Sequence, residues 1–497
     1  MIPVVTKEQM RQSDAKTIQS GTEAKDLMLR AGRGLFESYS WSGRTAIVCG
    51  TGNNAADGYV LALLLKKANL TCDLILTEER FSTDGRFFYD QCIKEGIKTE
   101  MFDPSQTDFS SYDQIVDCIY GIGFHSTVPD QVSALIKAIN QSGKTVISAD
   151  INSGLNANNG LSDCCVRSDL TVSLGSYKTG HFLNAAKDVI TSLKNADIGI
   201  PIENTHIYLT EASDFSCFFA NRKANSHKGT YGYVTVMGGC PEYSGAVKLS
   251  NLSAAALRAG CGVAQLAVPR SIAESVAPYL LESTLLPLPC DEAGRMCFDK
   301  ELLDRLLKSQ KALAIGMGWG RSEEYQRILS HILSNGSISL IIDADGLNTL
   351  AEMDLSLLRK TSCKVALTPH LKEFERLSGR PVAEIQQDPV GCAEDFAHRF
   401  GVVLLLKGSC TVVTDGKITY LVNRGCAGMA TAGSGDVLSG ILAGLHGYHE
   451  ISPLSVACGA YIAGRAGEIA QKTVGQVSMV ASDTVSQIAR AIREIQK

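Results

Sequence analysis

A glycine-rich segment near the carboxyl end of the chain has residue types that could transfer a phosphoryl group. Residues 431–445 read TAGSGDVLSGILAGL, so an apolar stretch with helical spacing begins directly after Asp436. This pattern places Gly433, Ser434 and Gly435 at a helix N-terminus, where unpaired N–H groups and the helix dipole attract an anion. Asp436 would lie in the first turn and could take the proton from a hydroxyl that attacks phosphorus. An aspartate that only caps its helix is the alternative.

Other polar or small residues of this half also follow short apolar segments. Because the carboxyl ends of parallel strands meet at one edge of a sheet, we expect these groups to surround the anion site. Each also has a structural alternative, such as capping a turn or facing solvent. The candidates are Gly238, Gly316, Gly318, Gly320, Asp343, Asp345, His370, Glu373 and Lys407.

The first half contains three comparable segments. Residues 49–58 read CGTGNNAADG and match the G-x-G-x-x-G/A dinucleotide pattern, with Ala55 in the third place. Asp117 precedes a Gly-x-Gly loop, and Asp150 precedes a Ser-Gly turn. In a doubly wound sheet these three strand ends share one crevice, where two acids and several Asn and Ser oxygens could hold a monovalent cation or move a proton. Each aspartate could instead cap a helix.

The elements that must position these residues alternate between strands and helices, which predicts two α/β domains with parallel sheets covered by helices. The polar and aromatic residues 211–228 interrupt the alternation, so we expect domains at 1–215 and 225–497. The first forty residues have helical patterns. The main predicted strands are 45–49, 72–77, 114–117 and 145–148, then 233–237, 263–268, 312–315, 340–342, 365–367 and 402–406, with helices at 58–67 and 244–260.

The composition bounds the class of protein. The chain has 497 residues, a hydrophobic content of 45% and a net charge of −5, which is typical of a folded globular protein without a basic face for nucleic acid. No apolar run approaches the roughly 20 residues that span a bilayer, and the first residues turn polar before a signal-peptide core could form. The 16 cysteines show no C-x-x-C spacing. We therefore expect free thiols in a cytoplasmic protein with no membrane partner.

The three segments of the first half resemble the epimerase domain of NAD(P)H-hydrate repair enzymes, whose motifs read approximately GNNGGDG, VDALFGTG and DIPSG. The resemblance covers most of residues 1–215 and implies a Rossmann-like, doubly wound sheet. Ala55-Ala56 stands where the family has Gly-Gly, and alanine would cost on the order of 1 kcal/mol if either position needs a positive φ. The resemblance implies that the hydrated nucleotide contacts Asn53, Asn54, Ala55, Ala56, Asp57, Gly121, Ile122, Gly123, Phe124, His125, Ser126, Thr127 and Asp150. It also implies a potassium ion held by Asn54, Asp117 and Ser153, with proton transfer as the alternative role of Asp117.

The second half resembles the NAD(P)H-hydrate dehydratase domain, which has a ribokinase-like α/β fold. That family reads approximately HKGxxG, GPGLG, DADALN, LTPHxxE, KGxxT and GTGDVLAG, and counterparts of all six motifs occur between residues 227 and 440. The resemblance implies that the hydrated dinucleotide contacts Ala246, Gly318, His370 and Asp436, the last as the catalytic base. It implies that the adenine nucleotide contacts Lys407, Gly408, Ser409, Cys410, Thr411 and Gly435.

The resemblance as a whole implies a bifunctional enzyme that repairs NAD(P)HX, the hydrated form of NAD(P)H. The first half would interconvert the R and S epimers. The second would phosphorylate the C6 hydroxyl of the S epimer from ADP or ATP with Mg²⁺, and loss of phosphate would restore NAD(P)H. A homo-oligomer is also implied. The alternative is a ribokinase-like kinase of a small alcohol, whose first half binds nucleotide without catalysis.

Overall fold

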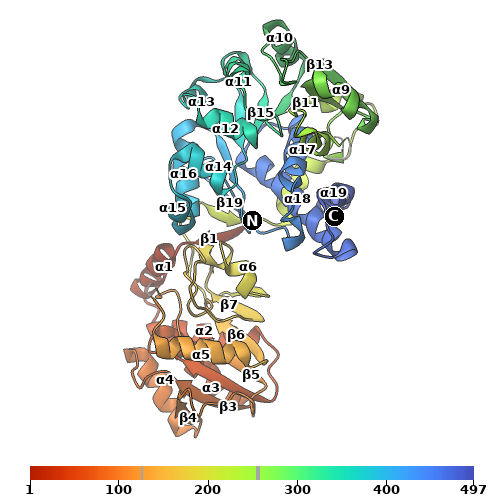
Figure 1. Cartoon of the computed structure of the whole chain (residues 1–497). Coiled ribbons are helices and arrows are strands. Elements are labelled where there is room, and N and C mark those ends of the chain that lie inside the picture. The colour runs from red at the N-terminus through yellow and green to blue at the C-terminus, as the bar shows by residue number, and fades with distance from the viewer. Residues whose placement is uncertain (125–126, 253–257, 497) are drawn as a thin grey trace. The chain divides into compact units, whose positions relative to one another are not determined.

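The structure is a computed structural model of the chain, and it describes residues 1–124, 127–252 and 258–496 (Figure 1). The chain forms two compact units, one of Pro3–Thr205 and the other of Met1–Ile2 with His206–Lys497. Residues 206–215, which the sequence pattern groups with the first half, therefore pack with the second unit. Within the described residues, no helix has the length and apolar character needed to span a bilayer.

The first unit is built on a seven-stranded parallel sheet with the strand order β4-β3-β2-β5-β6-β7-β9. The short strand β1 pairs in parallel with β8. The strands are β1 (Ile2–Val5), β2 (Arg44–Cys49), β3 (Thr71–Leu76), β4 (Lys98–Met101), β5 (Gln114–Cys118), β6 (Thr145–Ala149), β7 (Leu170–Leu174), β8 (Tyr177–Lys178) and β9 (Leu193–Ala196). The helices are α1 (Lys7–Gln19), α2 (Ala24–Glu37), α3 (Asn53–Lys67), α4 (Thr83–Lys94), α5 (Asp130–Gln141) and α6 (Ala186–Val189).

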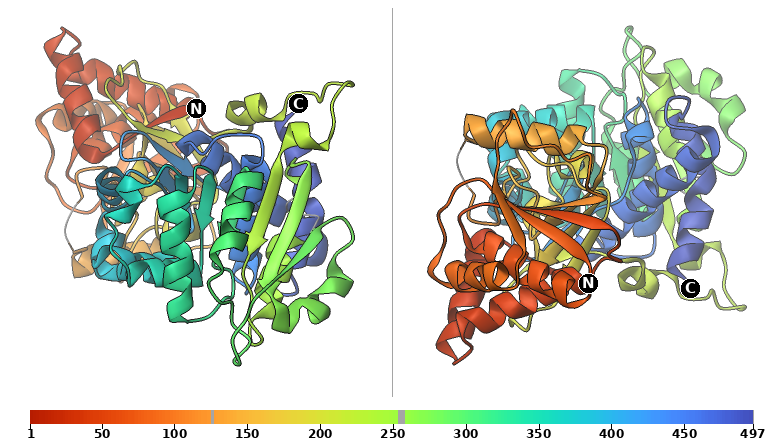
Figure 2. Two further views of the ribbon diagram at one scale, coloured as in Figure 1. Left: turned by 90° about the horizontal axis from the view of Figure 1, so that it is seen from above. Right: turned by 90° about the horizontal axis from the view of Figure 1, so that it is seen from below.

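Successive side chains of a strand point to opposite faces of a sheet, and in this sheet the side chains on both faces are buried. In β2, Ile47 and Cys49 join one apolar cluster with α2, α3 and α4, whereas Ala46 and Val48 join a second cluster with α5. Figure 2 shows the helix α5, in light orange, on the opposite side of the strands from the redder helices. The strand order reverses between β2 and β5, so the loops after these two strands diverge and leave a crevice.

The second unit is built on a larger sheet with the strand order β13-β12-β11-β14-β15-β16-β17-β18-β19-β10. Its pairs are parallel except that β18 runs antiparallel to β17 and β19. The strands are β10 (Ile207–Leu209), β11 (Tyr233–Met237), β12 (Val263–Pro269), β13 (Thr284–Leu288), β14 (Ala312–Ile315), β15 (Ser339–Ile342), β16 (Lys364–Leu367), β17 (Val403–Leu406), β18 (Thr411–Thr414) and β19 (Thr419–Val422). The helices are α7 (Ser244–Asn251), α9 (Arg270–Val276), α10 (Lys300–Ser309), α11 (Glu323–Asn335), α12 (Asp345–Ala351), α13 (Leu357–Lys360), α14 (Leu371–Ser378), α15 (Val382–Gln387), α16 (Pro389–Phe400), α17 (Ser434–His446), α18 (Pro453–Val474) and α19 (Ala481–Ile495).

The helices α17 and α18 pack on one face of this sheet, and α19 packs against them in the same apolar cluster. The teal helices α11 to α16 lie on the other side of the strands (Figure 1). Local sequence explains where these helices begin: Ser452 caps α18 ahead of Pro453, and Asp388 caps α16 ahead of Pro389. The predicted α/β class is thus confirmed in both halves.

Two predicted helices differ from those in the structure. The helix expected at 58–67 begins five residues earlier, at Asn53, so the NNAAD residues are its first five residues. The helix expected at 244–260 ends at Asn251 as α7, and residues 253–257 of the prediction lie outside the described residues.

Two candidate active sites

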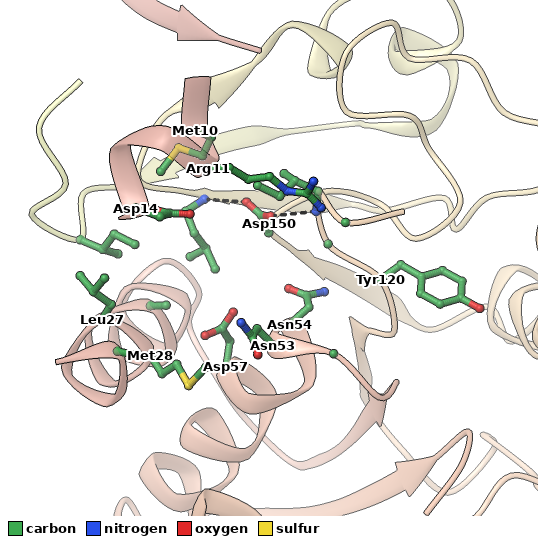
Figure 3. Close-up of a pocket in the computed structure, with 18 of the residues that line it drawn as sticks. Met10, Arg11, Asp14, Leu27, Met28, Asn53, Asn54, Asp57, Tyr120 and Asp150 are labelled. Carbon is green, nitrogen blue, oxygen red and sulfur yellow. Dashed lines mark hydrogen bonds between the residues drawn. The ribbon is translucent and has the colours of Figure 1, made fainter. Parts of the chain in front are cut away.

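A cavity with a volume of about 560 Å³ opens at the crevice between β2 and β5 of the first unit (Figure 3). The loop after β2, the loop after β5 and the end of β6 meet there, as the strand order requires. The side chains that line it include most of the nucleotide contacts predicted for this half. These are Asn53, Asn54, Asp57, Gly121, Ile122, Gly123, Phe124 and Asp150.

Three other predicted contacts lie away from the cavity. Ala55 and Ala56 are buried in the helical first turn of α3 and pack into the apolar core. Their backbone is helical, so neither position needs the positive φ that would make alanine costly. Thr127 is exposed and does not line the cavity. The predicted contacts His125 and Ser126 lie outside the described residues.

Asp117 is fully buried beneath the loop that follows β5, and its carboxylate accepts four hydrogen bonds. Ser153 donates two of them, from Oγ at 2.5 Å and from its backbone N–H at 2.9 Å. Ser148 Oγ donates at 3.0 Å, and the N–H of Ile119 donates at 3.2 Å. Burial raises the pKa of Asp117, and the hydrogen bonds from Ser153 oppose that rise. The network joins the ends of β5 and β6.

Asn54 has a buried side-chain amide whose oxygen and nitrogen have no hydrogen-bond partner among the described residues. An unpaired buried amide is costly, so such a group in a native site indicates an external ligand or ion. Gly121 lies directly against it, because a Cβ at Gly121 would be 3.4 Å from the Asn54 side chain. The N–H of Tyr120, in the loop after β5, donates to Ser153 Oγ at 2.8 Å, so this loop contacts the predicted cation ligand Ser153.

Asp150 is held by a buried lysine that the sequence analysis did not identify. Lys178 has a fully buried side chain, and its ammonium group donates to Asp150 Oδ1, to Leu174 O at 2.9 Å and to Ser173 Oγ at 3.2 Å. Asp150 also has a φ of 66°, a left-handed conformation that costs energy outside glycine. His181 bonds to the Asp150 carbonyl at 2.9 Å, and burial lowers the pKa of His181 to about 3.

Helices α1 and α2 supply a wall of the cavity that the sequence analysis also missed. Met10, Arg11 and Asp14 come from α1, and Leu27 and Met28 come from α2. The i, i+4 spacing of Met10 and Asp14 puts them on one face of α1, which is the only local signal for this placement.

The second site lies at the N-terminus of α17, as predicted. Gly433 precedes the helix with a φ of 95°, a conformation that favours glycine. The N–H groups at the start of a helix have no carbonyl partner within the helix, so those of the first turn of α17 can bind an anion. A Cβ at Gly435 would lie 3.3 Å from the ammonium nitrogen of Lys407, so this cation adjoins the helix N-terminus.

Lys407 is paired with Asp343 at the end of β15. The Lys407 ammonium donates to Asp343 Oδ1 at 2.7 Å, and Ser439 Oγ of α17 donates to Asp343 Oδ2 at 2.6 Å. The N–H of Ala344 donates at 2.9 Å from a residue with a φ of 50°. A strained residue beside a buried carboxylate is typical of a functional site. Asp343 thereby connects Lys407 to the helix that carries Asp436.

Asp436 lies in the first turn of α17, and its pKa is raised to about 7. Burial is the largest cause, and the negative charge of Asp343 is the next. The positive charge of Lys407 opposes both. A carboxyl group with this pKa is half ionised near neutrality, which suits a general base.

The remaining predicted contacts of this half lie at neighbouring strand ends. His370 caps α14: its Nδ1 accepts the N–H groups of Lys372 at 3.0 Å and Glu373 at 3.3 Å. Glu373 returns the bond by accepting the His370 N–H at 2.8 Å. Lys407 pairs with His370 through a backbone bridge between the two strand ends. Of the nucleotide contacts, Gly408, Ser409 and Cys410 form the turn between β17 and β18, and Thr411 begins β18.

Gly318 and Ala246 also lie together, as the prediction of a shared ligand requires. A Cβ at Gly318 would be 2.9 Å from the Ala246 Cβ, and Gly318 has a φ of 61°. Ala246 belongs to the first turn of α7.

The fold defines an α/β protein that joins a Rossmann-like unit to a ribokinase-like unit. Residues 234–490 match the family model described as NAD(P)H-hydrate dehydratase, and residues 24–180 match that of the YjeF-related protein N-terminus. A bifunctional NAD(P)H-hydrate repair enzyme of Moorella thermoacetica is 34% identical over 93% of this chain and 90% of its own length. The chain belongs to the family of bifunctional NAD(P)H-hydrate repair enzymes.

Solved structures agree with the fold of the second unit. An ADP/ATP-dependent NAD(P)H-hydrate dehydratase from Bacillus subtilis, co-crystallised with ATP and Mg²⁺, superposes with a TM-score of 0.50 at 25% identity. It covers 57% of this chain and 97% of its own. A ribokinase-like superfamily protein from Enterococcus faecalis superposes with a TM-score of 0.51 at 22% identity, over 60% of this chain and 99% of its own, which supports the fold alone. The small-alcohol kinase alternative is not favoured, because the repair-enzyme relatives span both units.

Proposed function

We propose that this chain repairs NAD(P)HX in two steps. The first unit interconverts the R and S epimers at C6, and the second unit dehydrates the S epimer to NAD(P)H with ADP or ATP. The observation that carries the proposal is Asp436, a base with a pKa of about 7 beside an anion-binding helix N-terminus and a lysine. Family membership supplies the substrate class.

In the second unit, the adenine nucleotide would bind along residues 407–411 and at Gly435. The Lys407 ammonium and the N–H groups of the first turn of α17 would stabilise charge on the phosphoryl group in transfer. Asp436 would accept the proton of the C6 hydroxyl as that oxygen attacks phosphorus.

The hydrated ring would lie near Ala246, Gly318 and His370. Once the hydroxyl is phosphorylated, the ring-nitrogen lone pair can expel phosphate, so the protein needs no further acid. His370 uses Nδ1 to cap α14, and its Nε2 lies 3.5 Å from Glu373 Oε1, so a substrate would meet the His370 and Glu373 side chains together.

Mg²⁺ would neutralise charge on the nucleotide phosphates in the second unit. The described residues contain no cluster of three or more His, Cys, Asp or Glu that could form a cage for a metal. That fits Mg²⁺, which commonly binds through substrate phosphates and one or two carboxylates. Glu373 is the candidate carboxylate ligand for Mg²⁺. Its side chain is buried, which raises the pKa of its carboxyl group, and the positive charge of Lys407 opposes that rise.

K⁺ would lie between Asn54 at the start of α3, Asp117 in β5 and Ser153 after β6. The Asn54 amide oxygen, which has no hydrogen-bond partner among the described residues, supports this assignment, since a cation would satisfy it. These three residues would hold the ion. The four bonds to Asp117 favour a role in holding this loop over a role in proton transfer.

The test follows absorbance at 340 nm as protein, Mg²⁺ and ADP or ATP are added to mixed epimers of NADHX and of NADPHX. Recovery of the NAD(P)H chromophore that is lost in Asp436→Asn would support dehydration, and near-complete recovery would show that epimerisation feeds it. No recovery with either nucleotide would contradict the proposal. Light scattering on the same samples tests the proposed homo-oligomer.

A further inference from the structure

Two carboxyl groups project into the cavity of the first unit from different walls. Asp14 comes from α1, whereas Asp57 comes from the N-terminal part of α3, and Figure 3 shows them on opposite sides of the open space. Asp57 is 8% exposed, and Asp14 is partly buried. Among the described residues that line the cavity, Asp14 is the only acid that comes from α1.

These two carboxyl groups differ from the other aspartates of the site. The Asp117 carboxylate accepts four hydrogen bonds, and the Asp150 carboxylate accepts a hydrogen bond from the ammonium group of Lys178. Within the described part of the chain, neither Asp14 nor Asp57 accepts a hydrogen bond from a side chain or the backbone. Uncommitted, partly desolvated carboxyl groups that face a cavity are available for chemistry on whatever fills it.

Epimerisation at C6 has a stereochemical requirement that this geometry meets. The carbon bears a hydroxyl and is bonded to the ring nitrogen, so the nitrogen lone pair can expel the hydroxyl and form an iminium ion. The new hydroxyl must then arrive on the opposite face. One group must donate a proton on one face and another must accept a proton on the other face.

We propose that Asp14 and Asp57 are the acid–base pair of the epimerase, acting on opposite faces of C6; this rests on the proposed function of the first unit. Protonated Asp57 gives its proton to the leaving hydroxyl, the C6–O bond breaks, and water departs as N1=C6 forms. A second water attacks C6 from the other face and gives its proton to Asp14. The ring-nitrogen lone pair is restored, one water has left and one has entered, and solvent returns the proton from Asp14 to Asp57. The reverse reaction exchanges the two roles.

The charges around Asp14 support its role as the base. Lys178 and Asp150 face it across the cavity, Asp57 faces it from α3, and Arg11 lies on its own helix. Burial raises the pKa of Asp14 to about 6, Lys178 lowers it and Asp150 raises it. Asp14 is therefore mostly ionised at pH 7 and loses its ability to accept a proton below about 6.

The experiment uses the full chain with Asp436→Asn, so that dehydration does not consume the substrate. NADPHX enriched in one epimer is incubated in H₂¹⁸O, and chromatography with mass detection follows both the epimer ratio and the label at C6. We expect one ¹⁸O per epimerisation, and a fall in rate of about 100-fold or more in Asp14→Asn and in Asp57→Asn. Asp14→Glu should restore part of the rate. Asp26→Asn, an exposed aspartate of α2 that does not line the cavity, is the matched control.

Each outcome decides a separate question. A parent protein that does not epimerise would overturn both the proposed function and this proposal. A parent that epimerises, with Asp14→Asn within twofold of Asp26→Asn, would overturn the acid–base pair alone. Epimerisation without ¹⁸O incorporation would also overturn it, because the C6–O bond would then remain intact. Thermal unfolding of each variant checks folding, and isosteric Asn at a carboxyl group without hydrogen-bonded partners should leave the Tm almost unchanged.

Discussion

The raised pKa of Asp436 predicts a pH dependence of dehydration that an ordinary aspartate would not give. With a pKa of about 7 instead of the usual 3.8, Asp436 is protonated in acid and cannot accept the substrate proton. Its ionised fraction rises from about 9% at pH 6 to about 91% at pH 8. We therefore expect kcat/KM to increase about tenfold between pH 6 and pH 8. An aspartate with an unshifted pKa would be ionised throughout this range.

The neighbours of Asp436 allow the cause to be tested. Asp343 raises the pKa of Asp436 and Lys407 lowers it, so Asp343→Asn should move the pH limb to lower pH and Lys407→Gln should move it to higher pH. We expect both variants to have lower activity, but the apparent pKa of each pH profile is obtained from rates relative to that variant's own maximum. Asp354→Asn, an exposed aspartate of the same unit, serves as the control.

The assay is the initial rate of NADH formation at 340 nm, measured from pH 5.5 to pH 9 at low substrate, because kcat/KM reports the pKa of the free enzyme. A rate that stays flat from pH 6 to pH 8 would refute Asp436 as the titrating base. A limb that keeps its position in Asp343→Asn would refute the electrostatic explanation and leave burial as the cause.

Three further predictions follow from close contacts in the structure. Gly433→Ala should reduce the free energy of unfolding by about 1–3 kcal/mol, because its φ is 95° and its Cβ would lie 2.4 Å from Leu249 Cδ1. Lys178→Met should reduce it by about 3–5 kcal/mol in the first unit, because Asp150 would remain buried without its cation. Denaturant unfolding measures both. Asn54→Ala should raise the K⁺ concentration for half-maximal epimerisation about tenfold or more, as measured by potassium titration of the epimerase rate.

The two stability predictions each have a control in the same chain. Gly245→Ala adds a methyl group with nothing within 4 Å and should not destabilise α7. Lys16→Met removes an exposed lysine from an ion pair and should change stability by less than about 1 kcal/mol. Equal losses for each variant and its control would contradict the structural reasoning, as would an unchanged potassium requirement in Asn54→Ala.

The sequence was sufficient to predict the class of fold and the groups around α17. Lys407 and Asp343 each follow an apolar strand, and parallel strands bring their carboxyl ends to one edge, whereas Asp436 follows a glycine-rich turn and begins an apolar helix. The structure places the Lys407 ammonium 2.7 Å from Asp343 and 3.3 Å from a Cβ at Gly435. Local pattern and topology agreed here, so proximity could be predicted without any knowledge of side-chain geometry.

The start of α3 could not be predicted from local pattern. Asn53, Asn54 and Asp57 have poor helix propensity and resemble a turn, yet α3 begins at Asn53 and includes all three. Burial of Ala55 and Ala56 against the core stabilises this turn, and that contribution comes from tertiary packing.

Long-range partners were also beyond prediction. Lys178 lies 28 residues from Asp150, in a short strand with no motif, and only the fold shows that its ammonium group is the counter-ion. Asp14 belongs to a helix whose position over the cavity depends on how the chain returns to the sheet. Charged residues usually face solvent, so neither the spacing nor the charge of Lys178 and Asp14 indicated that they line the cavity.

The complete burial of Lys178 makes this residue a chemical reporter on the first unit. Its side chain has no exposed surface, whereas Lys16 in the same unit is 61% exposed. Amine-directed acylating reagents should therefore label Lys16 at once and Lys178 only when the first unit opens. Peptide mapping of Lys178 over time would measure how often that unit opens, and binding of a nucleotide in the neighbouring cavity should slow the labelling.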